Sequence, residues 1–241
     1  MKALFLLPLL LLTLLTAPAQ AQRKSKSKNK TKSEAPLTAA NRLQPLFGGA
    51  TPAQAEQLVG KAFLDDVGRN FPSRAEASKF FSDKGYEYLS ENQPDTAAYR
   101  FNLAWLLDTK NVAAYRGLAV VASSQPTPDE SINLLTQGLA LAPSDYLMLS
   151  DMGTSYVMRY EQTKKKKDLT TGMDYLQKSL AIDSTNASAW QQMARAYYLQ
   201  EDYSKAWDAV HTGQKYSVAS IDFGFISELL AKAPDPQGTF K

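Results

Sequence analysis

ASAWQQMARAYYLQEDYSKAWDAVHTGQKYSVAS, residues 187–220, holds two apolar stretches separated by the polar pair Glu201-Asp202. In each stretch apolar side chains recur every three or four residues, which places them on one face of a helix. They are Trp190, Met193, Ala194 and Tyr197 in the first, and Ala206, Trp207 and Val210 in the second. The small side chains Ala194 and Ala206 allow two helix backbones to cross closely. The stretch therefore predicts a hairpin of two helices, at about 187–200 and 203–216.

The same order of residue types occurs three more times upstream. The four units are 78–111, 112–145, 146–186 and 187–220. Each is 34 residues long except the third, which has 41. We expect the seven extra residues of the third unit in the turn between its helices, around Thr163 to Leu169, where an insertion disturbs packing least. Four in-phase copies predict a fold built from repeated helical hairpins, and the alternative is an unrelated bundle of amphipathic helices.

This pattern resembles the tetratricopeptide repeat (TPR), in which an aromatic residue, Leu-Gly, Tyr, Ala, a bulky apolar residue, a small residue and Pro follow in order. The last unit matches with Trp190, Met193-Ala194, Tyr197, Ala206, Val210, Gly213 and Val218. The endings at 106–111, 141–145 and 182–186 are similar to one another. The resemblance, closest to secreted bacterial TPR proteins, implies an all-α, right-handed superhelix of about four repeats with an extended concave face.

The flanking segments have distinct compositions. Residues 1–21 have Lys2, an apolar run of about 12 residues and the small residues before Ala21, which together predict a cleaved secretory signal peptide. Residues 22–50 are expected to be a basic, disordered tail or linker. Residues 51–77 are expected to form a lead-in helix, with Thr51-Pro52 and Gln54 as its N-terminal cap. Residues 221–241 are expected to form a capping helix that ends in a loose tail.

Composition argues against most catalytic chemistry. The chain has no Cys and one His, His211, so thiolate and multi-histidine metal sites are excluded. We expect His211 to be a surface or half-buried residue and not a general base. No combination of nucleophile, base and electrophile is recognisable. The sequence therefore predicts a protein without enzymatic activity, metal or cofactor.

The positive charge is concentrated in the N-terminal part. Lys2 and six residues from Arg23 to Lys32 hold seven of the 27 Lys and Arg, which leaves 20 against 24 Asp and Glu, a net charge of −4 for the rest. Two basic clusters could contact an anionic membrane or cell-wall surface. They are Arg23, Lys24, Lys26 and Lys28, and Lys164, Lys165, Lys166 and Lys167. Solvated segments without a partner are the alternative interpretation of both clusters.

TPR proteins generally bind peptides or other proteins through first-helix residues of the concave face. Carried over by repeat phase, this implies a partner-binding groove of Lys79, Asp83, Tyr86, Arg116, Asp151, Arg195 and Tyr198. We therefore expect an exported, periplasmic or secreted adaptor that binds a protein or peptide and no nucleic acid. The alternatives are an envelope-tethering module held by its lysines, and a structural subunit of an outer-membrane complex.

Overall fold

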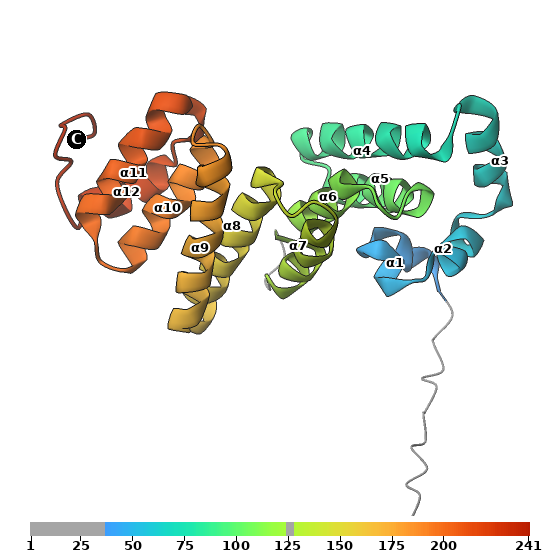
Figure 1. The fold of residues 1–241 in the computed structure, drawn as a ribbon, viewed down its shortest axis with the longest axis horizontal. Helices are drawn as coiled ribbons and strands as arrows, with labels where there is room; N and C mark the ends of the chain where they lie inside the picture. Colours follow the sequence, from blue (N-terminus) through green and yellow to red (C-terminus); the bar gives the residue numbers. More distant parts are fainter. Residues whose placement is uncertain (1–36, 124–127) are drawn as a thin grey trace, which may run out of the picture. The chain divides into compact units, whose positions relative to one another are not determined.

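The computed structural model describes residues 37–123 and 128–241, and every regular element in these ranges is a helix (Figure 1). The predicted signal peptide and the basic residues Arg23 to Lys32 lie outside the described residues. Four consecutive helical hairpins form most of the chain. They are α4 (Arg74–Ser90) with α5 (Pro94–Leu107), α6 (Val112–Ser123) with α7 (Asp129–Leu141), α8 (Tyr146–Thr163) with α9 (Lys166–Ile182), and α10 (Ala187–Leu199) with α11 (Tyr203–Tyr216). The predicted all-α fold of repeated hairpins is confirmed.

The similar endings of the repeats have a common structural role. Asn111 and Asn186 each end a short turn and cap the next helix, because their Oδ1 atoms accept hydrogen bonds from the N–H groups of Ala114 (3.1 Å) and Ala189 (3.2 Å). Their side-chain amides also donate to serines of the preceding hairpin, Ser78 for Asn111 and Ser179 for Asn186. The endings thus stop one hairpin, start the next and join the two.

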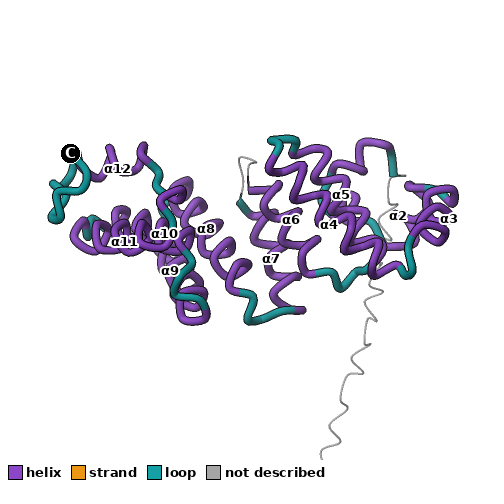
Figure 2. The backbone as a smooth tube through the Cα atoms, turned by 90° about the horizontal axis from the view of Figure 1, so that it is seen from above, coloured by secondary structure: helices purple, strands orange, loops and turns teal. Residues whose placement is uncertain are grey.

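Packing repeats in the same way from hairpin to hairpin. The first helices α4, α6, α8 and α10 contact one another in succession, and α5 and α7 each contact the first helix that follows them. Figure 2 shows the helices in purple, joined by short loops. Close approach within a hairpin depends on small residues. A Cβ atom added to Gly153 of α8 would lie 2.9 Å from the carbonyl oxygen of Gly172 in α9, so neither position has room for a larger side chain.

The segment before the hairpins is folded from Leu37 onward, whereas we expected a linker as far as residue 50. It forms η1 (Ala39–Leu43) and α1 (Leu46–Gly49), followed by α2 (Pro52–Val59) and α3 (Lys61–Asn70). Phe47 is fully buried with its ring 6.4 Å from that of Trp105, and the buried Asn102 donates to backbone carbonyls of this segment. One aromatic side chain and a buried amide therefore hold a segment whose sequence has no helical periodicity.

The lead-in region also differs from the prediction of one helix. Thr51 and Gln54 form the predicted capping box at the start of α2. Gly60 then adopts a φ of 87°, which favours glycine, and divides the region into α2 and α3. Phe63 of α3 packs on Phe81 of α4, with ring centroids 5.7 Å apart. The region covers the first hairpin through this contact, as terminal repeats require.

The extra residues of the third repeat lengthen its helices and do not enlarge its turn, so our prediction of an insertion in the turn is wrong. Helix α8 has 18 residues and α9 has 17, with only Lys164 and Lys165 between them. Lys164 has a φ of 56° and ends α8 in the left-handed conformation. Asp168 and Leu169 are buried in the first turn of α9, and Asp168 accepts a hydrogen bond from Arg159 (2.8 Å). The added turn of the hairpin therefore buries its own apolar residue, Leu169, and pairs its own charges, Asp168 and Arg159.

The C-terminal part ends in a packed segment and not in a loose tail. Helix η2 (Val218–Ser220) leads to α12 (Phe223–Leu230), whose Phe225, Ile226 and Leu229 are buried against the last hairpin. His211 is buried, contrary to our expectation, and its Nε2 lies 2.7 Å from Oδ1 of Asp235. Phe240 stacks on Trp207 and His211. These contacts hold Asp235 and Phe240 against α11.

Candidate partner-binding surface

Two clefts lie between successive first helices, and most of the predicted groove residues are found in them or beside them. The first, here called the α6–α8 cleft, has a volume of about 430 Å³ and includes Tyr86, Ala113, Arg116, Asp145 and Leu147. The second, the α8–α12 cleft, has a volume of about 290 Å³. It is lined by Thr154, Met158, Glu161, Gln191, Gln192, Arg195, Asp222, Phe225 and Glu228. Both clefts are built by side chains of the first helices, with α12 completing the second.

In the α6–α8 cleft, Arg116 of α6 donates from Nε to Oδ2 of Asp151 on α8, at 2.7 Å. Burial raises the pKa of Asp151 above its ordinary value, and the attraction of Arg116 offsets only part of this effect. Burial likewise raises the pKa of Tyr86, whose hydroxyl donates to the carbonyl of Ala113 (3.2 Å). The predicted residues Tyr86, Arg116 and Asp151 thus lie together, and the ion pair joins two hairpins.

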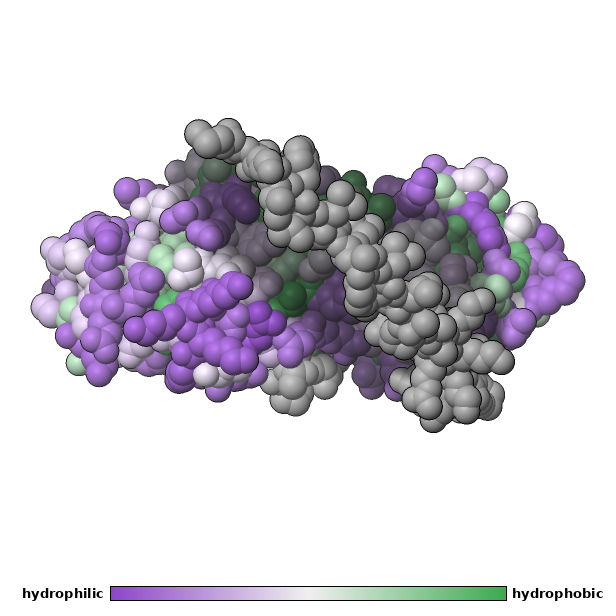
Figure 3. Space-filling view, turned by 60° about the horizontal axis from the view of Figure 1, so that its bottom comes forward, coloured by the Kyte–Doolittle hydropathy of each residue, from purple (hydrophilic) through white to green (hydrophobic). Residues whose placement is uncertain are grey.

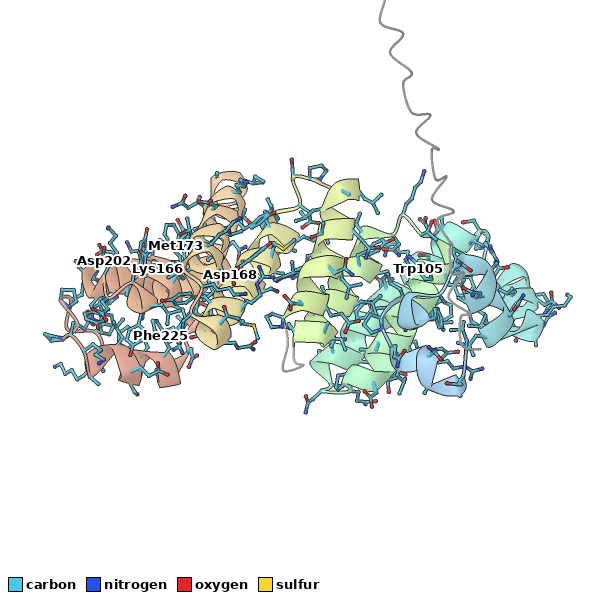
Figure 4. All side chains as sticks on the ribbon, turned by 90° about the horizontal axis from the view of Figure 1, so that it is seen from below. Trp105, Lys166, Asp168, Met173, Asp202 and Phe225 are labelled. Atoms are coloured by element: carbon cyan, nitrogen blue, oxygen red, sulfur yellow. The ribbon has the colours of Figure 1, made fainter. Side chains whose placement is uncertain are left out.

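In the α8–α12 cleft, Arg195 of α10 bridges two other helices. Its Nε donates to Glu161 of α8 and its Nη1 donates to Glu228 of α12, both at 2.8 Å. Burial alone would lower the pKa of Arg195, but the hydrogen bond to Glu161 and the charges of both carboxylates raise it. The guanidinium also lies 5.4 Å from the ring centroid of Phe225, which is labelled in Figure 4. Arg195 therefore contacts Glu161, Glu228, Phe225 and Tyr198.

Four predicted groove residues lie outside the lining of both clefts, and one of them, Asp151, borders the α6–α8 cleft through its bond to Arg116. Lys79 and Asp83 form an exposed ion pair within α4 (2.7 Å). Tyr198 packs on Phe225 with ring centroids 5.6 Å apart, next to the α8–α12 cleft. Lys79 and Asp83 are therefore separated from the cleft residues, whereas Tyr198 supports the aromatic floor of the second cleft.

Sequence reasoning missed the acidic partners Glu161 and Glu228 and the aromatic Phe225. One signal was present in the sequence. Asp151 follows Arg116 by 35 residues, and Arg195 follows Glu161 by 34, so opposite charges recur one repeat apart. Because equivalent positions of adjacent first helices are neighbours in such a fold, this spacing predicts ion pairs between hairpins. Phe225 could not be found in this way, since it lies beyond the repeats.

The lysines at 164–167 lie in the short turn between α8 and α9 and in the first turn of α9 (Lys166 and Asp168 are labelled in Figure 4). All four are exposed. Lys164 lies 5.6 Å from the ring centroid of Tyr160. No carboxylate within the described part of the chain forms an ion pair with any of them. They form an exposed basic surface, and none of them lines either cleft.

Two further observations bear on the class of site. Across residues 37–123 and 128–241, no three His, Cys, Asp or Glu side chains are grouped so that they could hold a metal ion. In the same ranges none of the helices combines the length and the apolar character that crossing a membrane requires. Hydrophilic side chains predominate on the face shown in Figure 3, with smaller hydrophobic areas between them.

No protein-family model matches this chain. Among solved structures, it is similar to MamA protein, with 16% identity and a TM-score of 0.45, over 65% of this chain and 92% of MamA. It is also similar to YrrB, described as a TPR protein with an unusual peptide-binding site, with 14% identity and a TM-score of 0.47. That likeness covers 73% of this chain and 95% of YrrB.

The four hairpins recur in phase, with small residues at their crossings and first helices packed on first helices. The chain has a tetratricopeptide-repeat fold. In this chain the two clefts are formed by the first helices of the repeats, with Glu228 and Phe225 added from the helix that follows the last repeat.

Proposed function

We propose that this chain is an exported, non-enzymatic scaffold that binds a protein or peptide partner through the α6–α8 and α8–α12 clefts. The observation that carries the proposal is the pair of clefts along successive first helices, each with an apolar side chain beside polar ones, Leu147 in the first and Met158 in the second. Concave sites of this kind, with a few polar groups beside apolar surface, are where ligands bind. Export follows from the signal peptide expected at residues 1–21.

The test is crosslinking and capture from intact cell envelopes, with variants that fill the clefts. Arg116 and Arg195 are unsuitable positions, because their ion pairs hold hairpins together. Leu147→Trp with Gln192→Trp introduces bulk into both clefts and leaves every ion pair intact. The matched control is Ala140→Trp with Gln177→Trp, at exposed or solvent-facing positions of the second helices α7 and α9.

Loss of one specific protein with the cleft variant, and its retention with the control, is the expected result. Capture that is the same for both variants would refute the cleft proposal. Intact mass of the exported chain supplies the second test, since cleavage after Ala21 leaves Gln22 as the first residue.

The exposed lysines at 164–167 favour a second candidate, an envelope-tethering module bound to an anionic surface. Attraction between exposed charges is screened within about 8 Å at physiological ionic strength, so tethering should weaken steeply as salt is added. A variant with Ser at Lys164, Lys165, Lys166 and Lys167, combined with deletion of residues 22–32, should then be released from envelopes while the cleft variant remains bound. The scaffold proposal expects the reverse.

A further inference from the structure

The α8–α12 cleft contains more negative than positive charge. Its lining includes three carboxylates, Glu161, Asp222 and Glu228, and one guanidinium, that of Arg195. Arg195 bonds to one oxygen of Glu161 and to one oxygen of Glu228. Asp222 uses Oδ1 to cap α12 through the N–H of Phe225 (3.1 Å). The second oxygen of each carboxylate has no hydrogen-bond donor among the described residues, and the cleft has a net charge of −2.

The same cleft has an apolar floor that suits the stem of a long basic side chain. Phe225 is 4% exposed and lies in the lining together with Met158. The guanidinium of Arg195 covers the Phe225 ring at 5.4 Å, so Met158 is the apolar side chain of the lining that remains for a partner's stem. Arg and Lys bury their aliphatic stems on apolar surface and keep the charged end beside carboxylates. This cleft offers both surfaces within one volume of about 290 Å³.

The charged lining residues of the neighbouring α6–α8 cleft are Arg116 and Asp145, and with Asp151, which lies beside the lining, the three sum to −1. Arg116 is bound to Asp151, and Asp145 of the lining adds a second carboxylate, which uses Oδ1 to cap α8. An acidic segment would therefore meet repulsion in both clefts, and both arginines that could attract it are already bound to carboxylates. A basic segment would meet attraction in both, and complementary charge of this kind selects partners and speeds their association.

We propose that the partner is a cationic peptide segment of another protein, with an Arg or Lys side chain beside Glu161, Asp222 and Glu228 and its stem on Met158, next to the Arg195 that already bridges the two glutamates. The proposal rests on the proposed function and names the chemical class of its ligand. The proposed binding surface consists of the two clefts along the first helices and α12.

The test measures fluorescence anisotropy of labelled peptides mixed with the purified full chain. One peptide consists of Gly-Ser-Arg repeats, and its counterparts have Glu or Gln in place of Arg. The variant Glu161→Gln with Glu228→Gln keeps acceptors for Arg195 and removes two charges. The matched control Glu91→Gln with Glu201→Gln removes two charges from exposed positions after the first helices α4 and α10.

We expect the Arg peptide to bind, and E161Q/E228Q to weaken that binding about tenfold while E91Q/E201Q changes it less than about twofold. Circular dichroism of each variant verifies that the fold is kept. Equal weakening by both double variants, or tighter binding of the Gln peptide than of the Arg peptide, would overturn the proposal. If no peptide binds while Leu147→Trp with Gln192→Trp still abolishes capture of an envelope protein, the scaffold function stands and the cationic class is wrong.

Discussion

Single side chains decide how closely the repeats pack, and Phe101 shows this most directly. It is fully buried in α5, with Gly85 of α4 on one side and Gly117 of α6 on the other. A Cβ atom at either glycine would overlap the Phe101 ring. The absence of a side chain at both positions therefore lets one aromatic ring fill the space between two hairpins.

Gly117→Ala should consequently lower the free energy of unfolding by about 1–3 kcal/mol, because overpacking forces a buried ring or a helix to shift. The matched control is Gly68→Ala, since Gly68 lies in helix α3 with no atom within 4 Å of an added Cβ. That change should be neutral or stabilising, as Ala favours helix more than Gly. Urea unfolding followed by circular dichroism measures both, and equal effects at the two positions would contradict the packing account.

Asp235 is the second residue whose environment has measurable consequences. Its side chain has no exposed surface, and this burial by itself would raise its pKa. Backbone N–H groups of Phe240 and Gln237 and the ring of His211 donate to it, and they lower its pKa below the ordinary value of 3.8. Its stabilising contribution is therefore complete above pH 3.8 and is lost as the pH falls through the folded-state pKa.

Asp235→Asn should remove that dependence. The variant should be less stable than the parent chain at about pH 7, and the difference should shrink as the pH falls below 3.8 and through the folded-state pKa of Asp235. Urea unfolding followed by tryptophan fluorescence reports on it, because Trp207 stacks on His211 and Phe240. The exposed Asp174 supplies the control, Asp174→Asn. If the difference in unfolding free energy between the variant and the parent chain did not change with pH, Asp235 would not be ionised in the folded chain.

At the scale of helices, the third hairpin shows that extra residues need not form a loop. Asp168 and Leu169 lie in the predicted insertion, yet Asp168 pairs with Arg159 and Leu169 is buried beside Val157. The sequence favours a loop there only because an insertion in a turn disturbs packing least. The ion pair between Arg159 of α8 and Asp168 of α9 instead joins the two lengthened helices next to the turn.

Deletion of residues 163–169 should therefore destabilise the chain. Loss of Leu169 alone corresponds to about 2–5 kcal/mol for a buried leucine, and Arg159 would also lose its buried partner. Thermal melts followed by circular dichroism should show a lower midpoint and a smaller helical signal. The control Lys164→Gly with Lys165→Ser changes only the turn and should melt within a few degrees of the parent. A deletion variant that melts like the parent would restore the loop interpretation.

Periodicity predicted the helices because a hairpin repeats its apolar pattern, and the small residues Ala194 and Ala206 indicated where two helices cross. It could not predict contacts made by residues without a period. His211 and Asp235 are 24 residues apart with no pattern between them, and Phe47 lies in a segment rich in glycine. For the candidate site, the repeat phase indicated Arg116 and Arg195, and their spacing from Asp151 and Glu161 indicates two of the ion pairs, but Glu228 lies beyond the repeats.

At the scale of the whole described chain, ion pairs connect the first helices in series. Arg116 joins α6 to α8, and Arg195 joins α10 both to α8 and to α12. Partly exposed pairs of this kind contribute little individually to stability. Their position is more important for stability than their number. Hairpins in a repeat fold contact mainly their neighbours, so each interface between neighbours stabilises both hairpins that form it.

Arg195→Met should test this local coupling, since it keeps a long apolar side chain at this position and removes both ion pairs. We expect the free energy of unfolding to fall by about 1 kcal/mol. Native-state hydrogen exchange should become faster in α10 and α12 while α4 and α5 keep their protection, because openings in repeat proteins are local. Lys79→Met, which removes a pair within α4, should leave exchange in α12 unchanged. Equal acceleration in α4 and α12 after Arg195→Met would show that the hairpins open as one unit, and the series of ion pairs would then have no local role.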